Sequence, residues 1–474
     1  MKIVLPVHHF PPHYSAGAEL YTFRLAHWLQ SHGHLVEAVC VEAIDQGEPG
    51  ELRATADRYE GIPVWRLAFN LGREENSARV HYDNPLPGEW FANYLQRARP
   101  DLVHFQAGYL IGVASMEATA AAGIPMALTL HDYWYLCPRI TLQRSDGSLC
   151  ETIPDDPAGC AWCMLLEKRR FRLADRMTGG LAGQVAQSLV LDDRRRWVAT
   201  RRERLTAALA LPGAVIAPSR FLAERFAPFV RPERLHLLRY GLDLAPLHGE
   251  HRRPITGATK IGFIGQITSI KGVHLLIEAF KLLRAESRPI ELRIYGGLDA
   301  KQAYARNYIN RLHQLAGNDT RIHFEGRFEN ARVAEILSGL DVTVVPSTWY
   351  ENSPLAILES QAAGTPVVTA ALGGMAELVR DSVDGLHFRP GDAADLARQL
   401  QRLLDEPDLL PHLRAGVVRN APRSIEDEMQ QLMEIYQGLV PQSTRHNLAR
   451  PIHAGGRLAE GPVGAVSATV QGAA

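Results

Sequence analysis

The segment DVTVVPSTWYENSPLAILESQAAGTPVV (341–368) decides the fold, because a strand, a helix and a second strand follow one another directly in it. The run DVTVV is apolar and β-branched, as expected of a buried strand. Ser353 is a favourable N-cap and Pro354 suits the first helical position. Gly364 stops the helix, which we expect over 354–363. A strand that returns through a helix to a second strand requires a parallel sheet with a right-handed crossover.

Strands and helices alternate on both sides of this segment. The predicted fold class is therefore α/β, with two doubly wound parallel-sheet domains. Such domains side by side create a cleft at the carboxyl ends of their strands, where ligands of open sheets bind. The clearest expected elements are strands at the N-terminus, 35–41, 101–105, 124–132 and 214–219, and helices at 17–31, 112–122, 301–316, 331–338, 392–404 and 425–437.

A polar, turn-rich stretch (239–260) separates the halves and indicates a boundary near residue 245. At 474 residues the chain also exceeds one ordinary domain. The predicted division is a first domain over 1–245 with a cysteine-rich and basic insertion at about 137–210, a second domain over 246–425, a C-terminal helix over 426–440 and a disordered tail over 441–474.

The composition is that of an ordinary globular protein. Hydrophobic residues make up 46% and charged residues 22% of the chain. Lys and Arg (51) balance Asp and Glu (52), so charge gives no reason to expect a nucleic-acid partner. We find no apolar run that spans a bilayer and no signal-peptide pattern, so the expected location is the cytoplasm.

Two glutamates flank the start of the expected helix at 354–363. The amino end of a helix carries free N–H groups and a partial positive charge, which suits a phosphate. Glu351 lies just before this helix and Glu359 lies inside it, and carboxylates accept hydrogen bonds from hydroxyls. Sugar hydroxyls, a diphosphate and ribose hydroxyls occur in this order in a nucleotide sugar. Alternatively, Glu351 is a loop charge and Glu359 a solvated helix position.

Several motifs, in order along the chain, resemble those of the retaining glycosyltransferases of family 4, which have the two-domain GT-B fold. The similarity extends to about residue 437. The matching stretches are HHFPPHYSAGAELYTFRLAHWLQSHGH near the N-terminus, TLHDYWYLCPR (129–139), FIGQITSIKG (263–272), EGRF (325–328), PSTWYENSPLAILESQAAGTPVV (346–368) and GGMAELVRDSVDGLHF (373–388).

The resemblance implies a donor site in the second domain. Glu351 and the backbone amides near Ser353 and Leu355 would hold the donor sugar and the diphosphate, and Glu359 would hold the ribose. Lys271 would pair with the phosphates as a point charge. The alternative for Lys271 is a surface lysine at a helix start.

The resemblance also implies contacts outside that helix. Gly17 would let backbone amides approach the donor phosphate, and His131 would bond the donor sugar, unless it is an ordinary histidine at a strand end. Arg327 and Phe328 would present backbone to the nucleobase. One position departs from the family: Gln266 stands where an arginine is common, so one positive charge is missing.

The implied activity is a retaining glycosyl transfer from a UDP- or GDP-linked sugar to a saccharide or lipid-linked acceptor, in polysaccharide or glycoconjugate biosynthesis. The catalytic residues would be His131, Lys271 and Glu351. Lys271 and helix amides would stabilise the departing diphosphate, so the scheme requires no metal cofactor. Arg139 is a candidate for the missing charge.

Other functions stay open. A GT-B epimerase or phosphorylase shares the fold, although no pyridoxal phosphate motif is recognisable. The chain could also be a catalytically silent subunit that binds a sugar nucleotide in a polysaccharide assembly complex, and Gln266 is the feature that favours this reading.

Four cysteines crowd into one stretch of the insertion. Cys137, Cys150, Cys160 and Cys163 end in a Cys-x-x-Cys pair. Short spacing between thiols in a reducing compartment predicts a structural zinc site. Unligated thiols, reversible disulfides and an iron–sulfur cluster are the alternatives.

The insertion is also basic. The runs EKRRFRLADR (167–176) and RRRWVATRRER (194–204) mix arginines with Phe171, Leu173 and Trp197. This pattern predicts peripheral contact with an anionic membrane at the inner face. A solvated face of a helical hairpin is the alternative.

Overall fold

The chain folds into two units. The computed structural model describes residues 1–14, 16–73, 77–183, 185, 192–245, 257–284, 289–297 and 303–441. The division falls at Leu238, at the amino end of the predicted linker, and the tail predicted to be disordered (441–474) lies beyond the described residues except for residue 441. Unit 1 comprises Met1–Ala217, Ala223–Leu238 and the chain from Met429 onward, and unit 2 comprises Pro218–Leu222 and Arg239–Glu428.

Unit 1 is built on a sheet with eight strands in the described residues, in the order β3-β4-β2-β1-β5-β6-β7-β8. Neighbouring strands are parallel except in the edge hairpin of β3 and β4, which the sequence did not predict. The central strands are buried and apolar, as expected of a parallel sheet covered by helices on both faces. The strands are β1 (Lys2–Val7), β2 (Leu35–Ala43), β3 (Arg53–Tyr59), β4 (Ile62–Ala68), β5 (Leu102–Phe105), β6 (Met126–Thr129), β7 (Ala214–Ala217) and β8 (Leu235–Leu237).

The helices of unit 1 connect these strands. The helix α1 matches its predicted range of 17–31, and α4 differs from its prediction by one residue at each end. The helix α17 begins in unit 2 and ends in unit 1, where Tyr436 donates to His104 Nδ1 or accepts from it at 2.6 Å. The helices are α1 (Gly17–Ser31), α2 (Ser77–Val80), α3 (Pro85–Ala98) and α4 (Val113–Ala121), together with α9 (Arg220–Phe226) and α17 (Ile425–Leu439), which are each divided between the two units.

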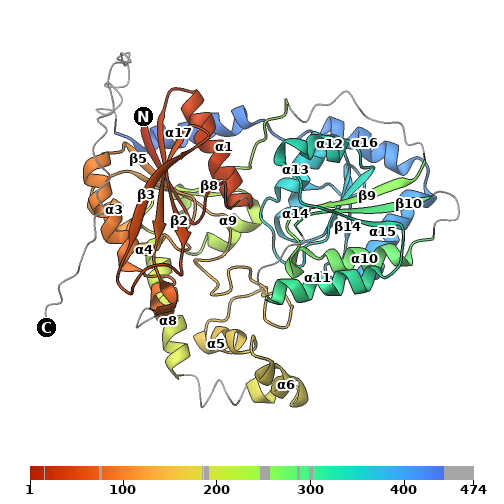
Figure 1. The fold of residues 1–474 in the computed structure, drawn as a ribbon, viewed down its shortest axis with the longest axis horizontal. Coiled ribbons are helices and arrows are strands. Elements are labelled where there is room, and N and C mark those ends of the chain that lie inside the picture. Colours follow the sequence, from red (N-terminus) through yellow and green to blue (C-terminus); the bar gives the residue numbers. More distant parts are fainter. Residues whose placement is uncertain are drawn as a thin grey trace. The chain divides into compact units, whose positions relative to one another are not determined.

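The insertion in unit 1 is helical, as predicted for the residues after 150. It contains α5 (Pro157–Leu165), α6 (Arg169–Met177) and α8 (Asp192–Ala208). Figure 1 shows α8 running from the side of α4 to α5, which packs against it. Asp156 caps α5 by accepting a hydrogen bond from the backbone N–H of Ala158 at 2.9 Å.

Unit 2 has a sheet with six strands in the described residues, all parallel, in the order β11-β10-β9-β12-β13-β14. The two doubly wound sheets predicted from the sequence are therefore confirmed. The strands are β9 (Thr259–Ile264), β10 (Ile290–Tyr295), β11 (Ile322–Gly326), β12 (Val342–Val345), β13 (Val367–Ala370) and β14 (Gly385–Phe388).

Helices cover both faces of the sheet in unit 2. In Figure 1, α10, α11 and α15 lie on one face, and α12 and α13 lie on the other. The sequence did not predict α16. The helices are α10 (Val273–Leu282), α11 (Ala303–Ala316), α12 (Val333–Ser338), α13 (Leu355–Ala362), α14 (Gly373–Leu378), α15 (Ala393–Asp405) and α16 (Leu409–Arg419). Among the helices of the described residues, none has the length and apolar character needed to cross a bilayer.

Candidate active site

In unit 2 the strand order reverses between β9 and β12, which lie side by side. Such a switch point is where ligands of open α/β sheets bind, beyond the carboxyl ends of the strands. Lys271 lies on the loop that follows β9, and Glu351 lies on the loop that follows β12. The fold thus brings together two residues that are 80 positions apart in the sequence.

Lys271 and Glu351 form an ion pair that the sequence did not predict. The ammonium Nζ of Lys271 lies 2.6 Å from Glu351 Oε1, and Ser347 donates to the same oxygen at 2.7 Å. The ammonium also lies 5.9 Å from the centre of the Trp349 ring. The Lys271 side chain is 26% exposed and the Glu351 side chain 7% exposed. Lys271 is therefore the more accessible partner, and an anion that enters from solvent meets its charge first.

A glycine allows the two loops to approach. Gly272 has φ of +72°, and a Cβ there would lie 1.9 Å from the carbonyl oxygen of Pro346. The backbone N–H of Thr348 donates to the carbonyl of Ile270 at 2.8 Å. Because any other residue at 272 would collide with backbone, the contact that positions Lys271 depends on this glycine.

A second glycine fixes the loop that carries Glu351. The backbone N–H of Gly374, at the start of α14, donates to the carbonyl of Glu351 at 2.8 Å. A Cβ at Gly374 would lie 1.7 Å from the carbonyl oxygen of Asn352. The loop between β12 and α13 is thus held from both sides, and the Glu351 side chain starts from a fixed backbone.

The predicted start of α13 is wrong by one residue. Pro354 has extended backbone angles and occupies the N-cap position, and α13 begins at Leu355 without a side-chain cap. The extended conformation of Pro354 delays the helix start by one residue. Ser353 is consequently not the cap. Its buried hydroxyl has no hydrogen-bond partner among the described residues, so a donor is left beside the free N–H groups of the helix start.

The remaining predicted residues of unit 2 lie on α13 and on loops after strands. Glu359 is 7% exposed, which excludes a solvated helix position, and Glu351 at 5% is likewise no exposed loop charge. Gln266 is exposed in the loop after β9. Arg327 is exposed after β11, whereas Phe328 packs against the ring of Tyr295, with ring centres 6.2 Å apart. Their contacts to a nucleobase stay a prediction.

In unit 1 the strand order reverses between β1 and β5. His8 directly follows β1 and Gln106 directly follows β5. His8 Nε2 lies 3.2 Å from Glu19 Oε1, which belongs to the first turn of α1. Burial would raise the pKa of Glu19, but the hydrogen bond and charge of His8 outweigh it and lower the pKa, so Glu19 is a carboxylate.

His131 lies beside these residues, just beyond the end of β6. Its Nε2 is 3.2 Å from Gln106 Oε1, and its ring meets Tyr21 edge-on with centres 5.3 Å apart. Desolvation, together with His8 and His104, lowers the pKa of His131 to about 3, although the side chain keeps some surface exposure. The imidazole is therefore neutral at physiological pH and serves as a hydrogen-bonding group.

We call His8, Glu19, Gln106 and His131 the unit 1 polar cluster. Three of its buried atoms have no hydrogen-bond partner among the described residues: His8 Nδ1, Glu19 Oε2 and Gln106 Nε2. An unsatisfied buried polar atom costs about 1–3 kcal/mol, so three such atoms require polar partners, which water or the hydroxyls of a ligand can supply. An amide donor beside a carboxylate acceptor suits hydroxyl groups, which both donate and accept.

Sequence reasoning missed His8, Glu19, Gln106 and Ser347. A signal was available, since His8, Gln106 and Ser347 come directly after or within two residues of buried strands. Gly17, which was predicted, opens α1, and a Cβ there would meet no atom of the described residues within 4 Å. The backbone at Gly17 is thus open to approach.

The four cysteines of the insertion are free thiols, and Arg202 donates to Cys160 Sγ at 3.7 Å. Among the described residues, no three His, Cys, Asp or Glu side chains are grouped closely enough to hold a metal ion. Burial raises the pKa of Cys137 to about 11. The zinc site at Cys137, Cys150, Cys160 and Cys163 therefore stays a prediction.

Arg139, the candidate for the missing phosphate charge, is engaged inside the insertion. Its guanidinium pairs with Glu167 and donates to the carbonyl of Gln143 at 2.9 Å. A role toward a phosphate would require it to leave both partners.

Two family descriptions match the chain. Residues 15–246 match "Glycosyltransferase Family 4", and residues 258–406 match "Glycosyl transferases group 1". The first match contains the unit 1 polar cluster except His8, and the second contains Lys271 and Glu351.

Curated relatives are similar over part of their length. A D-inositol 3-phosphate glycosyltransferase of Thermomonospora curvata is 33% identical over 227 residues, which are 44% of this chain and 52% of the relative. A glycogen synthase of Mycobacterium tuberculosis is 31% identical over 39% of this chain and 43% of the relative. The chain thus spans about half the length of the curated relatives it matches.

Solved structures match over nearly the whole chain. Sucrose-phosphate synthase from Thermosynechococcus elongatus has a TM-score of 0.64 at 19% identity and covers 92% of this chain and 98% of its own. HepE from Anabaena in complex with UDP-glucose has a TM-score of 0.63 at 18% identity, and the match covers 93% of this chain and 100% of the HepE chain. These similarities establish the GT-B fold.

Proposed function

The chain belongs to the family 4 glycosyltransferases, and from this premise we propose that it moves a sugar from a nucleotide-sugar donor to a hydroxyl of a saccharide or lipid-linked acceptor. The proposal includes retention at the anomeric carbon and a role in polysaccharide or glycoconjugate biosynthesis. The observation that carries it is the Lys271–Glu351 ion pair at the switch point of unit 2, beside the uncapped start of α13.

In this proposal unit 2 binds the donor. The diphosphate, UDP- or GDP-linked, takes the charge of Lys271, the Ser353 hydroxyl and the free N–H groups that begin at Leu355. Once Lys271 turns to the phosphate, Glu351 is free to accept hydrogen bonds from hydroxyls of the donor sugar. Glu359 accepts from the ribose.

The ion pair also explains how Lys271 remains in place without a ligand. A buried carboxylate without a cation is costly, so Glu351 retains the ammonium until a phosphate competes for it. Ser347 continues to donate to Glu351 Oε1 and keeps the carboxylate oriented during the exchange.

The reaction breaks the bond between the anomeric carbon and the phosphate oxygen, and the acceptor oxygen forms its bond on the same face. The proton of the acceptor hydroxyl passes to the departing phosphate oxygen. Negative charge grows on the diphosphate as the bond breaks, and Lys271 with the amides of α13 stabilises it. This scheme uses protein groups for the charge, and we propose that catalysis requires no metal ion.

Unit 1 contributes hydroxyl recognition. The unsatisfied atoms of the unit 1 polar cluster offer an amide donor, a carboxylate acceptor and an imidazole nitrogen. Glu19 is already paired with His8, so the cluster offers hydrogen-bonding groups without a free positive charge for an anion, which suits neutral saccharide hydroxyls. His131 contributes as a neutral hydrogen-bonding group.

The comparisons do not favour a silent binding subunit, since the named relatives are enzymes. A thermal-shift screen of UDP- and GDP-sugars on the full chain, followed by a release assay for the nucleoside diphosphate, tests the proposal. We expect one nucleotide sugar to raise the midpoint temperature of thermal unfolding. The protein should also hydrolyse this donor slowly when no acceptor is present.

The matched control for this screen is Glu359→Ala, which should weaken the response to that donor only. A panel in which no nucleotide sugar shifts the midpoint or releases its diphosphate would contradict the proposal.

A further inference from the structure

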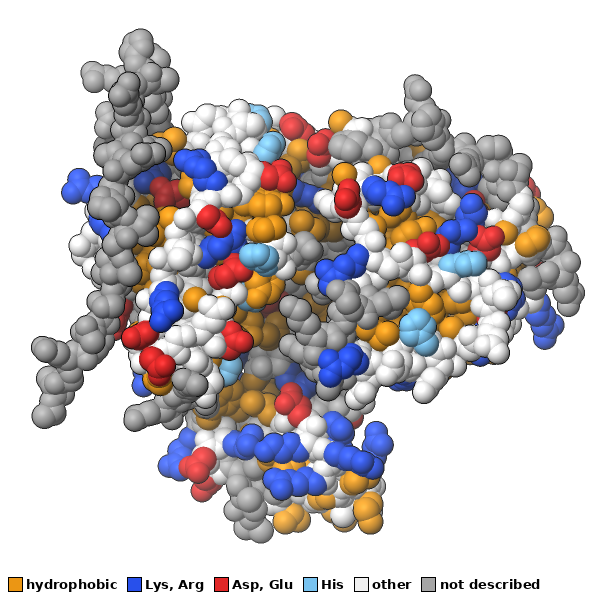
Figure 2. Space-filling view, viewed as in Figure 1, with side chains coloured by type: hydrophobic (Ala, Val, Ile, Leu, Met, Phe, Trp, Pro, Cys, Tyr) orange, Lys and Arg blue, Asp and Glu red, His pale blue; other side chains and the backbone are white. Residues whose placement is uncertain are grey.

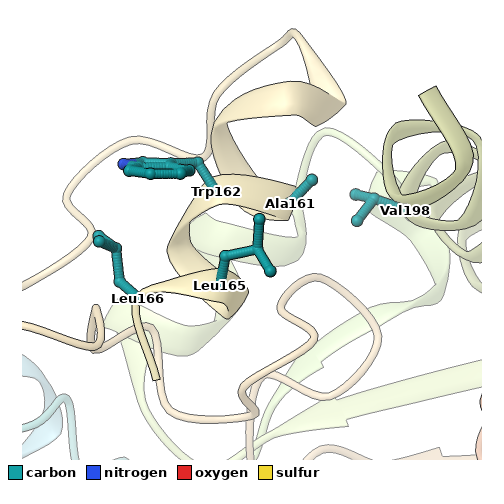
Figure 3. Close-up of a cluster of buried hydrophobic side chains, with 5 residues drawn as sticks. All are labelled: Ala161, Trp162, Leu165, Leu166 and Val198. Carbon is teal, nitrogen blue, oxygen red and sulfur yellow. The ribbon is translucent and has the colours of Figure 1, made fainter. Parts of the chain in front are cut away.

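The helix α6 packs one side chain onto the rest of the insertion. Phe171 meets the ring of Trp162 at 5.9 Å between centres, with the rings nearly perpendicular. Figure 3 shows the small core that Phe171 packs against: Ala161 and Leu165 of α5 lie on the side toward Val198 of α8, and Trp162 of α5 and Leu166, which follows it, lie on the opposite side. The side of α6 that carries Phe171 is therefore the inner side.

The opposite side of α6 is exposed and apolar. At 3.6 residues per turn, Leu173 and Met177 project about 200° and 240° around the helix from Phe171. Leu173 is 47% exposed and Met177 is 85% exposed. Two large apolar side chains on an outer helix face are unfavourable in water unless something covers them.

The exposed apolar residues continue beyond α6. Leu181 is 60% exposed and Val185 is 56% exposed. Ten exposed large hydrophobic residues are found among the described residues, and four of them lie between 173 and 185. This concentration is too high for scattered surface residues.

Arginines flank the apolar face. Arg169, Arg170 and Arg176 project about 160°, 260° and 140° from Phe171, next to Leu173 and Met177. All three are exposed, and they form no ion pair with the described residues, although Arg170 also lies over the Phe171 ring at 4.8 Å. Figure 2 shows Lys and Arg side chains gathered over this part of the molecule, with hydrophobic side chains at its outer tip.

The other charged residues of α6 are on different sides. Arg172 donates to the carbonyls of Leu166 and Glu167 at 3.0 and 2.9 Å and so belongs to the packing of the insertion. Asp175 projects about 40° from Phe171, on the inner side. The outer face therefore combines positive charge with apolar side chains and lacks a carboxylate of its own helix.

We propose that this face, formed by Leu173, Met177, Arg169, Arg170 and Arg176 and called here the α6 face, binds the surface of an anionic lipid bilayer. The arginines match the negative headgroups, and Leu173 and Met177 enter the boundary between headgroups and acyl chains. The inference does not rest on the proposed glycosyl transfer.

Charge complementarity favours a bilayer over other partners. A second copy of the same face would bring arginines against arginines. A nucleic acid would use the arginines, but it would leave Leu173 and Met177 exposed to water, since phosphate contacts require no apolar side chains.

Vesicle flotation of the full chain tests the inference. We expect the protein to float with phosphatidylcholine vesicles that contain phosphatidylglycerol. With vesicles of phosphatidylcholine alone, it should remain in the bottom fraction of the gradient. High salt should release it, because a screened surface no longer attracts arginines.

Two variants locate the contact. Each basic residue near an anionic surface raises the membrane partition coefficient by a factor of about five. The triple variant Arg169→Gln, Arg170→Gln and Arg176→Gln should therefore lower the partition coefficient about a hundredfold. Leu173→Gln with Met177→Gln should lower it about tenfold through lost apolar insertion. Circular dichroism confirms that both variants fold.

The matched control removes three exposed arginines elsewhere in unit 1, at Arg53, Arg97 and Arg231. It lowers the net charge equally and should change partitioning less than about threefold. An equal loss of vesicle binding in this control would overturn the assignment to α6. Failure of the parent protein to bind anionic vesicles would overturn it too. Preferential binding of a labelled oligonucleotide, or self-association abolished by the α6 variants without flotation, would overturn it as well.

Discussion

The switch points of the two sheets are built in opposite ways. In unit 2, Lys271, Glu351 and Ser347 satisfy one another, and Gly272 and Gly374 fix the loops that carry them. The charged groups of unit 2 are therefore paired, although the Ser353 hydroxyl and Trp349 Nε1 near them have no partner among the described residues. In unit 1, three buried atoms that belong to the charged and polar side chains of the cluster itself have no such partner. The difference indicates that an anionic ligand of unit 2 must displace Glu351 from Lys271, whereas a ligand of unit 1 can bind mainly by completing missing hydrogen bonds.

The largest effect is expected when the ammonium of Lys271 in unit 2 is removed. Lys271→Ala should lower turnover about a thousandfold, since a lost preorganised charge at a departing oxyanion costs about 3–4 kcal/mol. Steady-state rates measure the effect. Lys281→Ala, which removes an exposed lysine of α10, should leave the rate within about twofold.

Lys271→Ala also leaves Glu351 buried without its cation, which threatens folding. The double change Lys271→Met with Glu351→Gln removes both charges and separates the two effects. If this folded variant turned over at the parental rate, Lys271 would have no role in the chemistry.

The unit 1 polar cluster is tested by Glu19→Gln. The change preserves shape but removes the charged acceptor, so the KM for the acceptor should rise about thirtyfold, as expected for a lost hydrogen bond to a charged group. Donor affinity should not change. Glu89→Gln, on the exposed side of α3, is the control. An unchanged KM for acceptor together with weaker donor binding would assign Glu19 to the donor instead.

Low pH should reduce the free energy of unfolding of unit 1, because two of its buried histidines are held neutral. Burial lowers the pKa of both His104 and His131 to about 3, below the ordinary 6.5. Their neutral forms therefore contribute stability that is fully present above pH 6.5 and is lost as pH falls toward 3, by about 1.4 kcal/mol per histidine and pH unit.

Urea unfolding at a series of pH values measures this loss. His104→Gln removes one titrating group beside Tyr436 and Thr129. The free energy of unfolding of this variant should change less steeply with pH, even if it is lower than that of the parent at pH 7. An identical slope in parent and variant would show that His104 is not held neutral.

The smallest expected effect belongs to Ser353. Its hydroxyl is buried without a partner among the described residues, and Ser353→Ala removes only that group. Donor affinity should fall about fivefold, the value of one ordinary hydrogen bond, with no loss of stability. Calorimetric titration measures it. A destabilised variant with unchanged donor affinity would make the hydroxyl a structural group.

The fold was largely predictable because its signals are local. Apolar strands, the 3.6-residue period of α1 and stops such as Gly33 lie within a few residues of one another. The sharing of α17 between units was not predictable, since its contact of Tyr436 with His104 joins residues 332 positions apart.

The site was predictable only in part. Glu351, Glu359 and Lys271 were predicted as site residues from their motifs, and that role stays a prediction. The Lys271–Glu351 pair, which was not predicted, depends on the register of β9 with β12 and on the close approach at Gly272. The late start of α13 comes from the extended conformation of Pro354. Neither fact is present in the local sequence.

The most direct test of the central claim, that the switch point of unit 2 binds a diphosphate through Lys271, is calorimetric titration of the full chain and of Lys271→Ala with UDP and with GDP. We predict that one of the two nucleotides binds the parent and binds Lys271→Ala at least tenfold more weakly, the size of a lost charge-assisted hydrogen bond. Equal affinity of parent and variant, or no binding of either nucleotide to the parent, would contradict the account.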